Sequence, residues 1–510
     1  MADSEQAIPE RPKEEEEKGP SKNALKKAQK EKEKAEKKRL AQEKEAAQKA
    51  QSEGEDVSKE DYGETPMIGS AEYKKPISKD QRKTLAEVSD IADNEEVALR
   101  CVVRNARSQS AKLAFLELRD GMHSIQAVVA ASEKLSRQMV KFASGINPES
   151  LVDVEALVQS PRDPVKSTTI SNKELHIKKI YVVSKSESPL PIQIEDAERA
   201  LPDDEKKVEE QTDAESGRPL LGLNTRLDNR VLDLRASLNH AIVEIKGGVC
   251  RLFSEYMWQN QFQQIWTPKI LGSPSEGGGN VFELKYFNMA AYLAQSPQLY
   301  KQMMVSSRFK RVFEIAPVFR AENSNTARHL TEFMGLDLEM EFVDDYQEVT
   351  KFLKALVLHI FEGLRKDYSK QTELVRNVYK VEEFKIPKEV ADVPHYTFAE
   401  GIEMLREDGD KEASELEDLS TPQEKRLGKL ILDKTGSDFF VLDKFPLGVR
   451  PFYTMPAPED SKLSNSYDFF MRGQEICSGA QRVHNAEFLK QRMKGMDPPL
   501  DPEGPGFKPY

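Results

Sequence analysis

Cysteine and tryptophan are scarce in this chain of 510 residues, which contains three cysteines and two tryptophans. Cys101, Cys250 and Cys477 lie far apart, so their spacing offers neither a disulfide framework nor a paired set of metal ligands. We therefore expect reduced, mostly buried thiols, as in proteins of a reducing compartment.

Long apolar runs are also missing. The segment from Leu353 to Leu364 is interrupted by Lys, His and Glu and falls short of the roughly 18 apolar residues of a membrane span. The N-terminus is acidic, with four glutamates from Glu14 to Glu17, unlike a secretory signal or an arginine-rich transit peptide. These features predict a cytoplasmic protein without a membrane segment.

The chain has no surplus of positive charge, because its net charge is −12. Any RNA site must then be a local basic patch. Residues 21–50 hold eleven Lys and Arg against five Glu, without Gly or Pro, which favours a helix. Lys27, Lys30 and Lys34 fall on one face of that helix and could bind phosphates; a charged linker helix without such a role is the alternative.

Composition divides the chain into four regions, more than one domain being expected at this length. Residues 1–80 are predicted to be a disordered acidic start followed by the lysine-rich helical extension. Residues 90–185 have a β pattern, and residues 186–222 are rich in Pro, Asp and Glu, as in a linker. Residues 223–510 alternate helical and strand patterns and form a mixed domain.

The β region is predicted to contain five strands, with a helix from Ser132 to Ala143 between the third and the fourth. The strands are expected at 97–103, 115–118, 125–129, 151–158 and 175–183. This order is typical of an OB barrel, which binds single-stranded nucleic acid. Phe115, Arg119 and Gln126 form an aromatic, basic and polar set suited to unpaired bases, although Phe115 could equally be a buried strand residue.

Three short stretches of the last region point to chemistry. Residues 318–322 read V-F-R-A-E and place Arg320 and Glu322 on alternating positions of an apolar strand, before a polar turn and a second strand. An arginine at the rim of such a hairpin suits phosphate oxygens. Lys301 and Arg482, in the stretches 295–301 and 478–482, suit a small carboxylate. An ordinary edge strand with solvated charges is the alternative for V-F-R-A-E alone.

These stretches resemble the motifs of class II aminoacyl-tRNA synthetases. Val318 to Glu339 is similar to motif 2, and the helix of residues 236–258 with the strand of residues 262–270 is similar to motif 1. The resemblance covers residues 21–510 and is nearest to the aspartyl enzymes of eukaryotic, fungal-like cytoplasm. It implies an α+β multidomain protein, with an N-terminal OB barrel, an antiparallel-sheet catalytic core flanked by helices, and a homodimer through motif 1.

The activity implied by the resemblance is that of an aspartate–tRNA ligase. ATP would activate L-aspartate to aspartyl-adenylate, and the aspartyl group would pass to the 3′ end of tRNA(Asp). ATP and Mg²⁺ are the implied cofactors. Neither step needs a protein nucleophile, because positioning and charge neutralisation at phosphorus carry the catalysis.

The resemblance also implies roles for individual residues. Arg320 would meet the α-phosphate and Glu322 the acceptor end, while Phe333 would stack on adenine. Asp468 and Glu475 would hold Mg²⁺ bridged to ATP, and Arg482 would clamp the substrate side chain. The implied aspartate pocket comprises Ser275, Glu276, Gln298, Lys301, Asp337, Ser478 and Arg482. The implied tRNA contacts are Phe115, Arg119, Gln126, Ser324, Thr326, Lys27, Lys30 and Lys34.

The chain departs from the family pattern in two places. Ala327 stands where the family usually has a histidine in the motif 2 loop. No Gly-rich motif 3 follows Arg482, so the resemblance predicts a catalytic domain that is incomplete at its C-terminal end. Two alternatives stay open: an asparaginyl enzyme, which Gly-Ala-Gln-Arg argues against, and a catalytically inactive tRNA-binding or regulatory protein.

Overall fold

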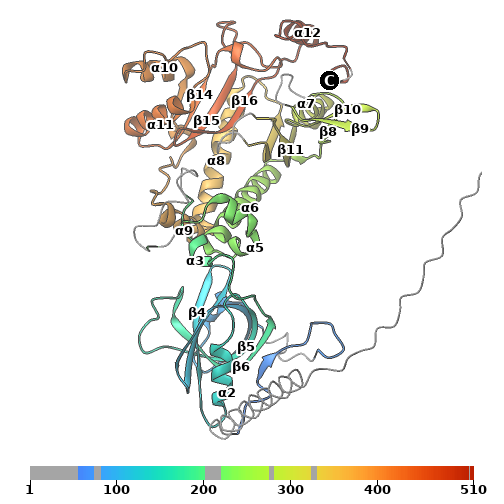
Figure 1. Ribbon diagram of the computed structural model, residues 1–510. Coiled ribbons are helices and arrows are strands. Elements are labelled where there is room, and N and C mark those ends of the chain that lie inside the picture. The colour runs from blue at the N-terminus through green and yellow to red at the C-terminus, as the bar shows by residue number, and fades with distance from the viewer. Residues whose placement is uncertain are drawn as a thin grey trace, which may run out of the picture. The chain divides into compact units, whose positions relative to one another are not determined.

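The computed structural model describes residues 55–73, 82–201, 217, 220–274, 281–322, 330–504 and 506–510. The chain divides into two compact units, residues 1–191 and 192–510, each described by itself below (Figure 1). Within the described ranges, no helix is both long and apolar enough to cross a membrane.

The first unit is a closed barrel. Its elements are β1 (Tyr62–Glu64), the 3-10 helix η2 (Leu85–Asp90), β2 (Glu96–Ser110), β3 (Leu113–Asp120), β4 (His123–Ala130), α2 (Arg137–Ser144), β5 (Leu151–Gln159) and β6 (Ile170–Ser184). The strand order is β1-β6-β4-β3-β2-β5, and β5 also pairs with β6, which closes the sheet. The long strands lie at the five predicted places, with α2 between the third and the fourth.

Alternation of apolar residues builds the barrel core. Val97, Leu99, Cys101 and Val103 on β2 are buried, because every second side chain of a strand faces the same side of the sheet. The tight connection between β3 and β4 uses Gly121, whose φ of +56° is of the kind that two-residue hairpin loops require. The core is therefore formed by the pattern from which the strands were predicted.

Two segments of this unit differ from the predictions. The region expected to be disordered or helical contributes β1, which pairs in parallel with β6. Helix α2 begins after Ser136, whose hydroxyl accepts a hydrogen bond from the Met139 N–H at 3.2 Å, so it begins later than the predicted Ser132.

The second unit combines helices with short sheets. Its α-helices are α3 (Ile194–Ala197), α4 (Leu223–Asp228), α5 (Arg230–Asp233), α6 (Ser237–Gln259), α7 (Gln298–Met304), α8 (Gln347–Asp367), α9 (Ser369–Tyr379), α10 (Phe398–Glu407), α11 (Thr421–Thr435) and α12 (Ala486–Lys494). Its strands are β7 (Gln263–Gln264), β8 (Ile270–Leu271), β9 (Glu283–Tyr286), β10 (Met289–Leu293), β11 (Arg311–Phe319), β12 (Glu332–Met340), β13 (His395–Thr397), β14 (Phe439–Asp443), β15 (Ser466–Met471) and β16 (Gln474–Ala480). A π-helix, η4 (Val305–Phe309), and the 3-10 helices η5 (Val390–Asp392) and η6 (Leu447–Val449) complete it.

The described strands of this unit form three sheets. The strand orders are β8-β10-β9, β12-β11-β7 and β13-β14-β15-β16. Pairing is antiparallel, as predicted for the catalytic core, except that β7 runs parallel to β11 and β13 runs parallel to β14. Among the described strands, β12 and β16 are not hydrogen-bonded to each other.

Helices cover the sheets on two sides. Aromatic and aliphatic side chains of α6 and α8 pack with β11, β14 and β15 in one core cluster. Helices α10 and α11 lie against the four-stranded sheet and share a second cluster with β14 and β15 (Figure 1). Part of the expected linker is also folded, since α3 buries Ile194 and Ala197 against Ala236.

Candidate active site

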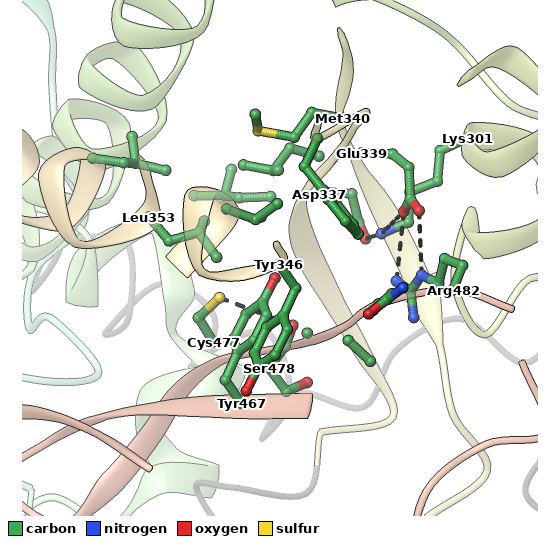
Figure 2. Close-up of a pocket in the computed structure, with 18 of the residues that line it drawn as sticks. Lys301, Asp337, Glu339, Met340, Tyr346, Leu353, Tyr467, Cys477, Ser478 and Arg482 are labelled. Atoms are coloured by element: carbon green, nitrogen blue, oxygen red, sulfur yellow. Dashed lines mark hydrogen bonds and ion pairs between the residues drawn. The ribbon is translucent and has the colours of Figure 1, made fainter. Parts of the chain in front are cut away.

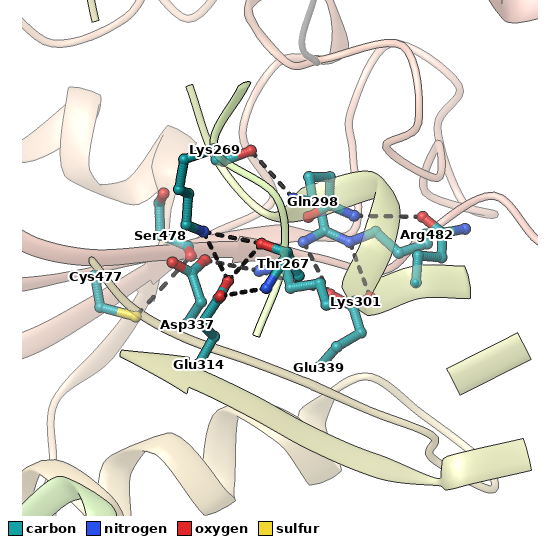
Figure 3. Close-up of polar contacts among 12 residues, drawn as sticks. Thr267, Lys269, Gln298, Lys301, Glu314, Asp337, Glu339, Cys477, Ser478 and Arg482 are labelled. Carbon is teal, nitrogen blue, oxygen red and sulfur yellow. Dashed lines mark hydrogen bonds and ion pairs between the residues drawn. The ribbon is translucent and has the colours of Figure 1, made fainter. Parts of the chain in front are cut away.

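Charged side chains from separate elements of the second unit meet around the end of β12 (Figure 3). Helix α7 contributes Gln298 and Lys301, which are 2% and 8% exposed. Strand β12 contributes Asp337 and Glu339, two residues apart and therefore on one face. Arg482 follows β16 and is held there by a β-bridge to Thr454. Two of the three predicted stretches, 295–301 and 478–482, thus converge on β12, although they lie far apart in the chain.

Ion pairs join these groups in a chain. Lys301 Nζ lies 3.0 Å from Asp337 Oδ1 and 3.8 Å from Glu339 Oε2. Arg482 donates to Glu339 from Nε at 3.2 Å and from a terminal nitrogen at 3.5 Å. Two cations and two carboxylates therefore form one network beside the cavity (Figure 2).

Arg482 is a permanent cation in this setting. Burial alone would lower the pKa of its guanidinium, but the Glu339 carboxylate raises that pKa well above its ordinary value. The guanidinium also lies over the ring of Tyr453, 4.9 Å from its centroid. A guanidinium that Glu339 and the Tyr453 ring hold in place is suited to a carboxylate ligand.

Two glycines leave room for the site. A Cβ at Gly335 would lie 2.8 Å from Asp337 Oδ2, and a Cβ at Gly479 would lie 2.5 Å from the Tyr467 ring. Such distances are shorter than carbon contacts in packed proteins allow. The glycine in Ser-Gly-Ala-Gln-Arg therefore lets β16 approach Tyr467.

A groove with a volume of about 660 Å³ lies between β12 and β16 (Figure 2). Consecutive residues of both strands line it, from Leu336 to Val343 and from Ile476 to Arg482, so it runs along strand edges. Apolar residues of α6 and α8, including Phe253 and Leu353, also line it. Among the described strands, none pairs with the edges of β12 and β16 that bound this groove, so an extended segment could pair there.

Arg320 and Phe333 lie together at the other end of the β11–β12 hairpin. The Arg320 guanidinium is 5.6 Å from the centroid of the Phe333 ring, and Arg320 Nε is buried with no hydrogen-bond partner in the part of the chain that the structure describes. Strand β11 ends at Phe319, so the prediction that V-F-R-A-E is a strand throughout was wrong. Arg320 and Glu322 follow the strand, where the Glu322 N–H donates to the Arg320 carbonyl at 2.8 Å.

Asp468 and Glu475 lie on the neighbouring strands β15 and β16. Asp468 is 2% exposed and accepts a hydrogen bond from Arg450 at 2.7 Å, while its Oδ1 has no hydrogen-bond partner among the described residues. Burial, together with the Glu475 carboxylate, raises the pKa of Asp468 to about 7, and Arg450 opposes this rise. Two carboxylates with an orphaned buried oxygen fit a cation that takes oxygen ligands.

These two carboxylates do not make a complete metal cage. Among the residues that the structure describes, no group of three or more His, Cys, Asp or Glu side chains is arranged to hold a metal ion.

In the barrel unit, Phe115 and Gln126 line a cavity of about 150 Å³ together with Asn105, Arg107 and Thr168. Arg107 lies over the Phe115 ring at 5.5 Å. Gln126 donates to Glu174 at 3.1 Å. An aromatic ring, a cation and amide groups around one hollow can stack on and read an unpaired base.

Arg119 was predicted to belong to this set, and the structure places it elsewhere. Its side chain is 4% exposed and donates to both carboxylate oxygens of Glu149 at 2.9 Å. A guanidinium held in a buried pair cannot reach a base without breaking that pair. The basic residue that lies beside the Phe115 ring is Arg107, its partner in the β2–β3 register.

Several predicted residues lie outside the described part of the chain. They are Lys27, Lys30, Lys34, Ser275, Glu276, Ser324 and Thr326. Sequence reasoning also missed residues that the structure brings into the site, namely Glu339, Glu314 and Lys269. The signal for Glu339 was present, because it shares strand parity with Asp337.

Comparison with known proteins identifies relatives over most of the chain. The family model "tRNA synthetases class II (D, K and N)" matches residues 222–499. Cytoplasmic aspartate–tRNA ligase of Caenorhabditis elegans is 46% identical over 442 residues, which is 86% of this chain and 81% of that protein.

Solved structures give the same picture. A putative aspartyl-tRNA synthetase from Leishmania major Friedlin matches with a TM-score of 0.78 and 36% identity, covering 89% of this chain and 90% of that one. Asparaginyl-tRNA synthetase from Pyrococcus horikoshii, complexed with asparaginyl-adenylate, matches with a TM-score of 0.67 and 25% identity, covering 83% and 88%.

Proposed function

Because the chain belongs to the class II tRNA synthetases of the aspartate, lysine and asparagine group, we propose that it is a cytoplasmic aspartate–tRNA ligase. The observation that carries the proposal is the convergence of Lys301 and Arg482 beside Asp337. Two cations can hold the side-chain carboxylate of L-aspartate, and one carboxylate can hold its ammonium group.

Selectivity for aspartate follows from charge. Arg482 and Lys301 meet the side-chain carboxylate, Asp337 and Gln298 the amino group, and Ser478, Ser275 and Glu276 complete the pocket. Asparagine would leave a cation facing a neutral amide, at a cost of about 2–4 kcal/mol. An asparaginyl enzyme, the alternative from the same family, would need a neutral group in place of one of these cations.

ATP binds at the Arg320 end of the hairpin in this proposal. Arg320 meets the α-phosphate, where charge grows during attack by the aspartate carboxylate, and Phe333 stacks on adenine. Asp468 and Glu475 are the residues that would hold Mg²⁺. Mg²⁺ bound there would neutralise phosphate charge, and the fit rests on the orphaned Asp468 Oδ1.

The tRNA contacts lie in both units. We assign the barrel to the OB class, with Phe115, Gln126 and Arg107 on anticodon bases in place of Arg119. Glu322, Ser324 and Thr326 meet the acceptor end. Lys27, Lys30 and Lys34 bind phosphates, so removing residues 1–75 should flatten the salt dependence of tRNA binding by about 0.7–0.9 in log–log slope for each lost contact.

A second copy of the chain is the partner proposed for the motif 1 region. On α6, Ile242, Val243 and Trp258 are 38%, 56% and 50% exposed. Nearby in the chain, Trp266 is 77% exposed and Phe287 is 78% exposed. Large apolar side chains left exposed along this region favour a homodimer interface. The molar mass in solution tests this proposal, and a monomer at micromolar concentration would contradict it.

The groove between β12 and β16 supports a place for one more strand. A strand of the motif 3 type would pair with both edges and join the two sheets into the single antiparallel sheet expected for the family. We also propose that, within the cytoplasmic aspartyl enzymes, this chain is most similar to the fungal-like members.

ATP–pyrophosphate exchange with the purified chain tests the function. We expect exchange with L-aspartate and aspartylation of tRNA(Asp), and about 30- to 1000-fold weaker exchange with L-asparagine. Equal exchange with asparagine would favour the asparaginyl alternative. Retained tRNA binding without any exchange would favour an inactive tRNA-binding protein.

A further inference from the structure

Two carboxylates face each other across the β11–β12 hairpin. Glu314 on β11 is the register partner of Asp337 on β12, which places their Cβ atoms about 5 Å apart. Like charges in this position repel and destabilise a sheet. Each has its own lysine: Lys269 Nζ is 3.0 Å from Glu314 Oε2, and Lys301 Nζ is 3.0 Å from Asp337 Oδ1 (Figure 3).

The two carboxylates differ in the hydrogen bonds that their oxygens accept and in their exposure. The Glu314 side chain is 3% exposed and accepts hydrogen bonds from the Thr267 N–H at 2.7 Å, the Thr267 hydroxyl at 2.8 Å and Lys269 at 3.0 Å. The Asp337 side chain is 24% exposed and lies at the cavity. Glu314 is therefore saturated, while Asp337 can still meet a ligand.

Glu314 holds the segment from Thr267 to Lys269. Backbone hydrogen bonds connect this segment to the site. The Ala294 N–H donates to the Lys269 carbonyl at 2.9 Å, and the Phe319 N–H donates to the Ala294 carbonyl at 2.9 Å. Ala294 precedes the segment that carries Gln298 and Lys301, and Phe319 precedes Arg320. The Glu314–Lys269 pair thus lies where three segments of the site are joined.

We propose that Glu314 and Lys269 are positioning residues for the amino-acid pocket, acting as a matched charge pair. Lys269 neutralises Glu314, so that Lys301 is shared between Asp337, Glu339 and the ligand carboxylate and is not drawn toward Glu314. Neither residue touches the substrate. This inference rests on the proposed function, because the ligand it concerns is L-aspartate.

A single variant and a double variant test the pair. Dissociation constants for L-aspartate and for ATP are measured by calorimetry on the full chain. Lys269→Met leaves two opposed carboxylates with one lysine, and we expect aspartate binding to weaken about tenfold while ATP binding is unchanged. Adding Glu314→Gln removes the surplus charge, and we expect most of the lost aspartate affinity to return.

Glu415→Gln is the matched control. Glu415 lies outside the cavity and pairs with Arg406 at 2.6 Å on the surface of the second unit, so aspartate binding should not change. Unchanged aspartate binding in Lys269→Met, or a double variant weaker than Lys269→Met alone, would overturn the inference. A wild-type chain that binds aspartate but catalyses no exchange would contradict the proposed function alone.

Discussion

Each unit of the molecule buries an arginine against a glutamate, and the two pairs differ in their surroundings. In the barrel, the side chains of Arg119 and Glu149 are 4% and 2% exposed and meet at 2.9 Å through both carboxylate oxygens. In the second unit, Arg482 and Glu339 are 17% and 11% exposed and meet at 3.2 and 3.5 Å. The looser pair, with Lys301 beside it, is the one that we propose to meet a ligand, whereas the more deeply buried pair has a structural role.

Two buried aspartates repeat this difference. Asp153 in the barrel accepts hydrogen bonds from Arg82 and Arg100 at 2.7 to 2.9 Å, and its pKa is lowered. Asp468 has one arginine and an orphaned oxygen, and its pKa is raised to about 7. Buried charges that are fully paired stabilise the fold, while buried charges that are underpaired are typical of sites.

The largest expected effect falls on stability. Arg119→Met leaves Glu149 buried without its cation, so we expect about 3–5 kcal/mol less local stability in the barrel. Amide hydrogen exchange in β3 and β5 measures this loss, while aspartate activation should be unchanged. The control is Arg104→Met, whose 3.1 Å pair with Glu117 is about one-fifth exposed and contributes less than about 1 kcal/mol. An unchanged exchange pattern with weaker tRNA binding would make Arg119 a tRNA contact after all.

The next effect falls on catalysis. Arg482→Gln removes the cation that the substrate carboxylate needs, so we expect kcat/KM for aspartate to fall about 30- to 1000-fold, or about 2–4 kcal/mol. The KM for ATP should not change. Arg406→Gln, which breaks a surface pair with Glu415, is the control. Equal activity of wild type and Arg482→Gln would show that the looser pair is structural too.

Particular residues show how far the sequence could predict these features. Alternation of Val97, Leu99, Cys101 and Val103 predicted a barrel strand, because one-sided burial leaves a period of two. Arg119 shares parity with Phe115 but is drawn to Glu149, 30 residues away in sequence. Such a distant partner leaves no local signal.

Several residues of the candidate site could be predicted from the sequence, but the ion pairs between their side chains could not. Lys301, Asp337 and Arg482 were predicted to share a pocket, and the structure brings them together. Glu339 and the Glu314–Lys269 pair were missed, since only tertiary contacts bring these ordinary strand and loop residues to the cluster. The gap between β12 and β16 could not be read from either strand alone, because both have ordinary strand patterns.

A smaller effect is expected at the barrel cavity. Phe115→Ala removes the ring against which a base can stack, so tRNA binding should weaken by about 1–3 kcal/mol, while exchange with aspartate continues. Phe142→Ala is the control, since Phe142 packs on Tyr62 at a centroid distance of 5.1 Å outside this cavity. If both variants lose tRNA affinity equally, the loss reflects barrel stability and not base stacking.

The smallest effect concerns the acid sensitivity of the barrel, which we expect to depend on Asp153. Burial alone would raise the pKa of Asp153, but Arg100 and Arg82 together lower it below its ordinary value of 3.8. The folded state therefore binds the proton more weakly than the unfolded state, so this group stabilises the fold above pH 4 and loses that contribution as the pH falls further. We expect the free energy of unfolding of the barrel to decrease below about pH 4, by about 1.4 kcal/mol for each unit of difference between the folded and unfolded pKa values. Hydrogen exchange in β5 between pH 3 and 6 measures this decrease, and Asp153→Asn should be less stable throughout but flatter with pH. An equal slope in both proteins would mean that another carboxylate sets the acid response.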